Sequence, residues 1–143
     1  MSVPVLALLT LLLALFVGAC AADSTSAREV FGDEALLSDD FPGMDEISLV
    51  WRDGKQGGTV VKPNYTSASR NLVAESGYSA ESGFAELVEV AATSGWKEAT
   101  GEDAGTDFFT ANRTLPEGEA HLIINISPGP EPKVLVVSMT LDE

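Results

Sequence analysis

The clearest periodic pattern in the chain lies between Ser79 and Gly95. Four apolar residues there fall at positions i, i+3, i+4 and i+7, on one face of a helix: Phe84, Leu87, Val88 and Ala91. Ser79 suits the N-cap, Glu81 suits the first turn near the positive end of the helix dipole, and Gly95 suits the left-handed position after the last turn. We therefore expect an amphipathic helix packed on a second layer.

Alternation predicts a β-hairpin before this helix. The first strand places three apolar residues on one face: Ile47, Leu49 and Trp51. The dipeptide Asp53-Gly54 is typical of a two-residue hairpin turn, and a second strand is expected at residues 58–62. Residues 64–76 remain ambiguous, because their apolar residues suit a short helix whereas their serines favour a loop.

Four further strands are expected after the helix, at residues 96–100, 106–112, 120–127 and 133–141. The last two place apolar residues on a common face: Leu122, Ile124, Ile126, Leu135, Val137, Met139 and Leu141. The connections are short and rich in Gly, Pro and acidic residues, so successive strands are expected to be antiparallel neighbours. On the opposite face, Val134, Val136 and Ile123 indicate a second covering layer, a partner surface or ordinary strand propensity.

These elements predict the fold class. We expect an α+β fold with two layers, in which an antiparallel sheet of about five to six strands (hairpin, helix, meander) packs on one main amphipathic helix. The chain length after residue 46 suits a single small α+β domain, residues 47–143. Its element order, with a helix ending in Gly95-Trp96 followed by a meander, loosely resembles small uncharacterised lipoproteins of the bacterial envelope.

The N-terminus carries a different pattern. From Val5 to Val17 only Thr10 is not strongly apolar, which is typical of the hydrophobic region of a secretory signal peptide. The residues that follow, Val17-Gly18-Ala19-Cys20, resemble the lipobox of bacterial lipoproteins. This resemblance implies a signal peptide at residues 1–19, cleavage before Cys20 and acylation of the Cys20 thiol. The mature protein would then be anchored to the outer face of the cytoplasmic membrane, or to the outer membrane in a cell with two membranes.

Two alternatives stand beside lipidation. Ala19-Cys20-Ala21 also fits an A-x-A cleavage site, which would release the chain, and the uncharged stretch of residues 3–22 is long enough to span a bilayer uncut. The first five residues lack Lys and Arg, so only the terminal amine supplies positive charge there. Cys20 is the only cysteine of the chain, so it has no disulfide partner within it. Lipidation therefore explains its position best.

The net negative charge of the chain argues against nucleic-acid binding. The chain has 22 acidic against 8 basic residues, for a net charge of -14, and such a surface repels phosphates. Residues 20–46 are expected to form the lipidated cysteine and an acidic tether that holds the domain away from the membrane. Four apolar residues within this stretch allow a short helix or a segment docked on the domain instead: Val30, Phe31, Leu36 and Leu37.

Candidate chemistry is sparse. His121 is the only histidine and is expected on the strand face opposite Leu122, where an exposed or partly covered histidine without a catalytic role is the default. The Glu86 and Glu89 carboxylates are expected to be solvated, and Asp103 with Asp107 supplies too few fixed ligands for calcium. Three N-x-[ST] triplets would matter only in a eukaryotic secretory pathway, at Asn64, Asn112 and Asn125. We expect no catalytic, cofactor or metal site, so Cys20 is the one predicted site residue.

Three functions follow from these observations. The first is a lipid-anchored, non-catalytic protein of the bacterial envelope that binds a partner protein or a small ligand. The second is an accessory or carrier lipoprotein that holds an apolar ligand between helix and sheet, in a cavity under Trp51, Phe84 and Trp96. The third is a hydrolase that uses His121. The expected partners are the membrane, through acyl chains on Cys20, and an envelope protein or small ligand, but not nucleic acid.

Overall fold

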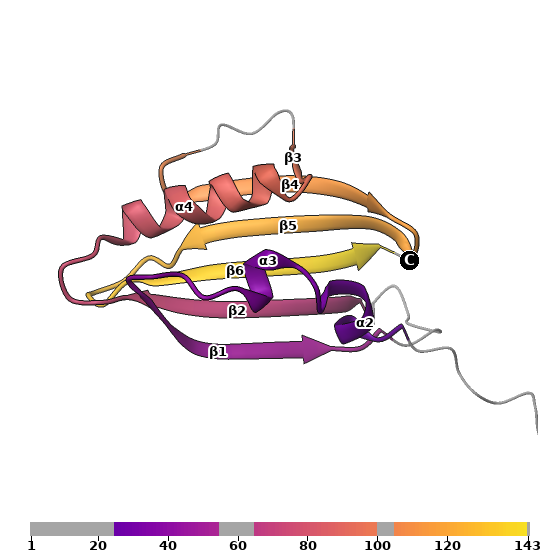
Figure 1. The fold of residues 1–143 in the computed structure, drawn as a ribbon, viewed down its shortest axis with the longest axis horizontal. Helices are drawn as coiled ribbons and strands as arrows, with labels where there is room; N and C mark the ends of the chain where they lie inside the picture. The colour runs from indigo at the N-terminus through magenta and orange to yellow at the C-terminus, as the bar shows by residue number, and fades with distance from the viewer. Residues whose placement is uncertain (1–24, 55–64, 100–104, 143) are drawn as a thin grey trace, which may run out of the picture.

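A six-stranded antiparallel sheet forms the centre of the protein (Figure 1). The computed structural model describes residues 25–54, 65–99 and 105–142. Its elements, in chain order, are α2 (Ala27–Phe31), α3 (Ala35–Ser38), β1 (Met44–Arg52), β2 (Thr66–Ala74), α4 (Ala80–Thr93), β3 (Lys97–Glu98), β4 (Phe108–Leu115), β5 (Gly118–Ile126) and β6 (Val134–Asp142). The predicted α+β class and the predicted strand number are confirmed.

The strand order is β1-β2-β6-β5-β4-β3, so the last strand lies in the middle of the sheet. The hairpins β3–β4, β4–β5 and β5–β6 form the expected meander. β6 then pairs with β2, from Thr66 opposite Leu141 to Val73 opposite Val134. This pairing joins the two halves of the chain into one sheet, and the strand predicted at residues 96–100 is reduced to the short edge strand β3.

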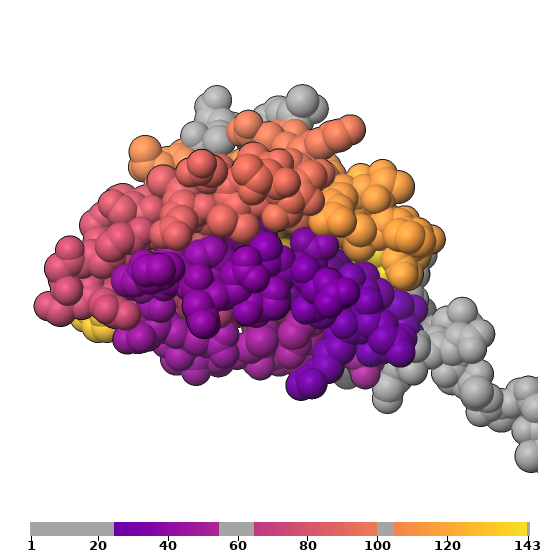
Figure 2. Space-filling view, in the orientation of Figure 1, coloured from indigo at the N-terminus to yellow at the C-terminus, as the bar shows by residue number. Residues whose placement is uncertain are grey.

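One face of the sheet is covered by α4 together with the N-terminal segment, residues 25–43 (Figure 2). The expected apolar face of β5 and β6 is buried beneath them, at Leu122, Ile124, Leu135, Val137, Met139 and Leu141. The expectation of one main covering helix is therefore not confirmed, because the short helices α2 and α3 share the covered face with α4 (Figure 2).

The helix α4 begins and ends with the predicted residues. The Ser82 backbone N–H donates to the Ser79 hydroxyl at 3.0 Å, and Gly95 has a φ of 88°, in the left-handed region. Phe84, Leu87 and Ala91 are buried and Val88 is half-buried, as the periodicity predicts. At Gly83 an added Cβ would lie 2.7 Å from the Met44 sulfur, so a glycine here allows α4 to approach the sheet closely.

The first hairpin differs from the prediction. Its strands are β1 and β2, so residues 64–76, expected to be helix or loop, largely form a central strand, while the strand expected at residues 58–62 lies outside the described residues. Asp53-Gly54 is not a two-residue turn, because Arg52 pairs with Ser67. Small and polar residues hide the period of β2: its covered positions include Ala68 and Arg70, both buried.

Ile47 was expected to share a face with Leu49 and Trp51, and this expectation is wrong. The register between β1 and β2 shifts between Glu46 and Ser48, which marks a β-bulge. The extra residue reverses the alternation before it, so Ile47 is 56% exposed while Leu49 and Trp51 pack against the core.

Residues 20–46 were expected to form a tether, and for residues 27–46 the structure corrects this. Ala27, Phe31, Leu36 and Leu37 are almost completely buried, and β1 begins at Met44. The folded domain therefore begins before Ala27 rather than at Ile47, and the docked alternative applies to this segment. Most of its acidic residues are exposed to solvent, as expected, but its apolar residues face the sheet and are buried.

Candidate functional site

The predicted site residue Cys20 lies outside the described residues, which begin five positions later at Thr25. The Thr25 carbonyl accepts hydrogen bonds from the Gly54 N–H at 3.2 Å and from the Thr66 hydroxyl at 3.3 Å. The chain therefore joins the domain at the end of the sheet where β1 ends and β2 begins (Figure 1). No helix in the described ranges is long and apolar enough to cross a membrane.

His121 lies on the sheet face opposite the helices, half-exposed, as the alternation predicts. Its Nδ1 is 2.7 Å from the Asn112 Oδ1, and its Nε2 is 2.8 Å from the Asp142 Oδ2. An oxygen atom thus lies within hydrogen-bond distance of each of the two ring nitrogens. A general base needs one free nitrogen, so the three side chains would have to rearrange before His121 could accept a proton from a substrate.

The two candidate carboxylates of α4 have different surroundings. The Tyr78 hydroxyl donates to Glu86 at 2.8 Å, and this hydrogen bond raises the pKa of Tyr78, with smaller contributions from burial and from the Glu86 charge. Glu89 is exposed on α4. Asp103 lies outside the described residues, and no group of three or more potential metal ligands occurs within the described ranges.

Two buried charges that the sequence did not reveal hold the N-terminal segment on the sheet. Glu34, 7% exposed, accepts from the Arg113 guanidinium at 2.7 Å and from the Trp96 indole N–H at 3.2 Å. The Arg113 guanidinium also lies over the Trp96 ring, 5.8 Å from its centre. This cluster joins the start of α3 to β4 and to Trp96, which lies three residues after the end of α4.

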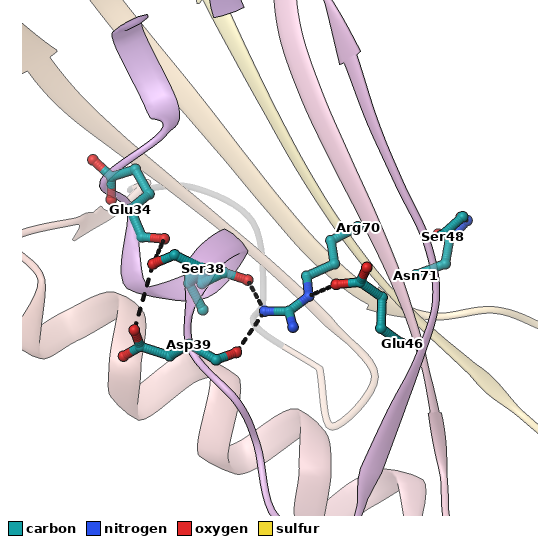
Figure 3. A network of polar contacts seen from close by, with 8 residues as sticks. Glu34, Ser38, Asp39, Glu46, Ser48, Arg70 and Asn71 are labelled. Carbon is teal, nitrogen blue, oxygen red and sulfur yellow. Dashed lines mark hydrogen bonds and ion pairs between the residues drawn. The ribbon is translucent and has the colours of Figure 1, made fainter. Parts of the chain in front are cut away.

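Arg70 is the second buried charge (Figure 3). It extends from the covered face of β2 and donates from Nη1 to the carbonyl oxygens of Leu36 at 3.2 Å and Asp39 at 2.8 Å. Its Nε donates to Glu46 at 2.8 Å, and its guanidinium lies 5.5 Å from the centre of the Phe41 ring. Sequence reasoning had no signal for this role, because an arginine among serines in an ambiguous segment reads as exposed.

The sheet face opposite the helices carries many short polar side chains. One row runs across four neighbouring strands through Ser67, Thr140, His121 and Asn112. Exposed apolar side chains lie among such residues: Val50 at 51%, Ile123 at 39% and Phe108 at 37%. Of the residues whose role had been left open, Val134 and Val136 are half-buried on this face. No described helix contacts this surface, which we call the open face.

A surface hollow of about 630 Å³ lies near the start of β4, the end of β5 and the start of β6. It includes Asp107, Phe108, Asn125 and the ion pair of Lys133 with Glu81, which measures 3.4 Å. A hydrogen bond to the Glu81 backbone N–H and the Lys133 charge lower the pKa of Glu81. The hollow is not lined by the residues expected to surround a carrier cavity, Trp51, Phe84 and Trp96.

Comparison with protein-family models, with curated proteins and with solved structures finds no match.

Proposed function

We propose that this chain is an exported lipoprotein of the bacterial envelope, anchored through acyl chains on Cys20, whose domain binds a partner protein through the open face without catalysis. The observation that carries the binding role is that, among the described residues, α2, α3 and α4 all pack on one side of the sheet. Exposed Val50, Ile123 and Phe108 among hydroxyl and amide groups match the mixed polar and apolar character of surfaces that form non-obligate interfaces.

The distribution of charge favours the same face. The N-terminal segment carries five acidic residues against Arg28, and α4 carries three acidic residues and no basic one. The open face is nearly balanced, with Arg52 and Lys97 against three acidic residues, Asp45, Glu119 and Asp142. An anionic partner is therefore repelled less by the open face than by the helical layer.

The non-catalytic part of the proposal draws support from the hydrogen bonds of His121, which engage both ring nitrogens. Export and anchoring draw support from the lipobox resemblance and from the single cysteine at that position. With Cys20→Ser we expect the membrane-bound mature form to be lost, as judged by cell fractionation and by metabolic labelling with a fatty acid. Normal processing and unchanged retention of that variant would overturn the anchoring.

The partner-binding role is tested in intact cells with a photo-crosslinking amino acid at Ile123, on the open face. The matched control carries the same amino acid at Ala92, which is exposed on α4. We expect a discrete crosslinked protein from position 123 and none from position 92. Crosslinking from position 92 alone would assign binding to the helical layer and refute the role of the open face.

A further inference from the structure

The end of the domain that joins the N-terminus has an unusual set of side chains. Around the point where Thr25 contacts Gly54 and Thr66, the structure places Arg28, Trp51, Arg52 and Tyr65, which we call the anchor end. α2 and the end of β1 mark its position, and the turns from β2 to α4 and from β5 to β6 lie at the opposite end (Figure 1).

The covalent distance to Cys20 restricts which end can meet a membrane. Four residues lie between Cys20 and Thr25, so their Cα atoms are five steps apart along the chain, and a fully extended chain spans at most about 17 Å over five steps. The nine-residue strands are about 30 Å long. The far end of the sheet therefore cannot lie on the membrane while Thr25 points away from it, because the chain is too short.

The side chains of the anchor end suit a lipid headgroup layer. Trp51 is half-buried, with the Arg28 guanidinium 5.6 Å from its ring centre, and Tyr65 is 47% exposed. Trp and Tyr are enriched at membrane interfaces because one part of the side chain is apolar and the other is polar, and arginine keeps its charge at the phosphates while its stem packs on apolar surface.

Local charge supports the same contact. The Asp53 carboxylate accepts from the Ala27 N–H at 2.9 Å, at the start of α2. Among the described residues at this end, Arg28 and Arg52 stand against Glu29 and Asp53, so that the charges balance within a chain of net charge -14. The anchor end is thus far less acidic than the helical layer, and its approach to anionic headgroups is correspondingly less costly.

We propose that the anchor end rests on the headgroups of the same membrane that holds the acyl chains, with Trp51 and Tyr65 at the interface. This orientation rests on the proposed lipidation of Cys20. It directs the β2–α4 and β5–β6 turns away from the membrane. The strands then run roughly parallel to the membrane normal, so the open face is accessible from the side.

The test uses the full mature lipoprotein in vesicles of phosphatidylcholine and phosphatidylglycerol that contain bromolipids as tryptophan quenchers. The chain has two tryptophans, and Trp96, 3% exposed, is a buried reference. We expect bromolipids to quench the wild type more strongly than Trp51→Phe, in which only Trp96 emits. Equal fractional quenching of the two proteins would overturn the membrane contact.

A second readout does not depend on Trp51. Because acylation consumes the only native thiol, Tyr65→Cys and Ser76→Cys each introduce a single free thiol, the first at the anchor end and the second at the exposed turn after β2. An environment-sensitive dye at position 65 should shift to the blue on vesicles and be quenched by headgroup quenchers, whereas position 76 should not respond. Equal responses from vesicle-bound protein would refute the orientation, whereas protein that fails to float with vesicles would instead refute the anchoring.

Discussion

Phe31 provides the sharpest test of where the folded domain begins. It lies in α2, within a stretch rich in acidic residues, yet its side chain is 0% exposed and belongs to the core under the sheet. Replacing a buried phenylalanine by alanine removes its transfer free energy and leaves a cavity, at a cost of about 3–5 kcal/mol. Since domains of this size are stable by only about 5–15 kcal/mol, Phe31→Ala should lower the midpoint of thermal unfolding by roughly 10–20 °C.

The measurement is thermal and urea unfolding, followed by circular dichroism, of the chain from residue 21 onward. Ile47→Ala is the matched control, because alternation placed Ile47 in the core whereas the structure exposes it. That control should change the free energy of unfolding by less than about 0.5 kcal/mol. An unchanged stability of Phe31→Ala would show that residues 27–46 are a tether after all. An Ile47→Ala protein as unstable as Phe31→Ala would show instead that Ile47 is buried, as the alternation predicts.

Two further predictions concern α4. Leu87→Ala should destabilise the domain by about 2–5 kcal/mol, because Leu87 is fully buried, whereas Glu89→Ala on the exposed side should have little effect in the same unfolding assay. Tyr78→Phe removes the hydrogen bond to Glu86 and should cost about 0.5–1.5 kcal/mol at pH 7. Because the folded pKa of Tyr78 is raised, this stabilisation is fully present below about pH 10 and is lost as the pH rises through the folded value. Urea unfolding between pH 7 and 11 should show the two proteins converging, and a constant difference would exclude the titration of Tyr78 as its cause.

The parts of the fold that the sequence predicted are those where apolar residues mark the period densely. In β6, every second residue from Leu135 to Leu141 is apolar and buried, and in α4 the buried residues keep helical spacing. Such patterns survive without knowledge of the tertiary structure, because burial of one face is the cause of the pattern. The helix, the meander and the α+β class follow from them.

The failures have a different cause. β2 is a central strand, but its covered positions include Thr66, Ala68 and Arg70, so apolar alternation is absent and only pairing with β1 and β6 makes it a strand. Ile47 was misplaced because a bulge leaves no mark in the residue pattern. Each error reflects a contact between segments distant in the chain, which local propensity cannot encode.

For the candidate sites too, the features set by neighbouring residues were predicted, and the features set by contacts between distant segments were not. The side of the sheet on which His121 lies follows from its neighbours in β5, and this was predicted. Its hydrogen bonds to Asn112 and Asp142 depend on the register of three strands and were not. The acylation of Cys20 remains a prediction. Its motif can be read from four neighbouring residues, but Cys20 lies outside the described residues.

The buried charges connect the proposed anchor to the fold. Arg70 cannot be replaced by an apolar residue without leaving the carbonyl oxygens of Leu36 and Asp39 and the Glu46 carboxylate without their donor. Buried ion pairs add little net stability compared with apolar packing, but losing one partner costs several kcal/mol, so they favour one arrangement over its alternatives. Arg70 and Glu34 therefore select the position of the N-terminal segment on the sheet more than they add to its stability. Because this segment continues directly from the residues after Cys20, the same two contacts determine which end of the domain an acylated Cys20 would hold at the membrane.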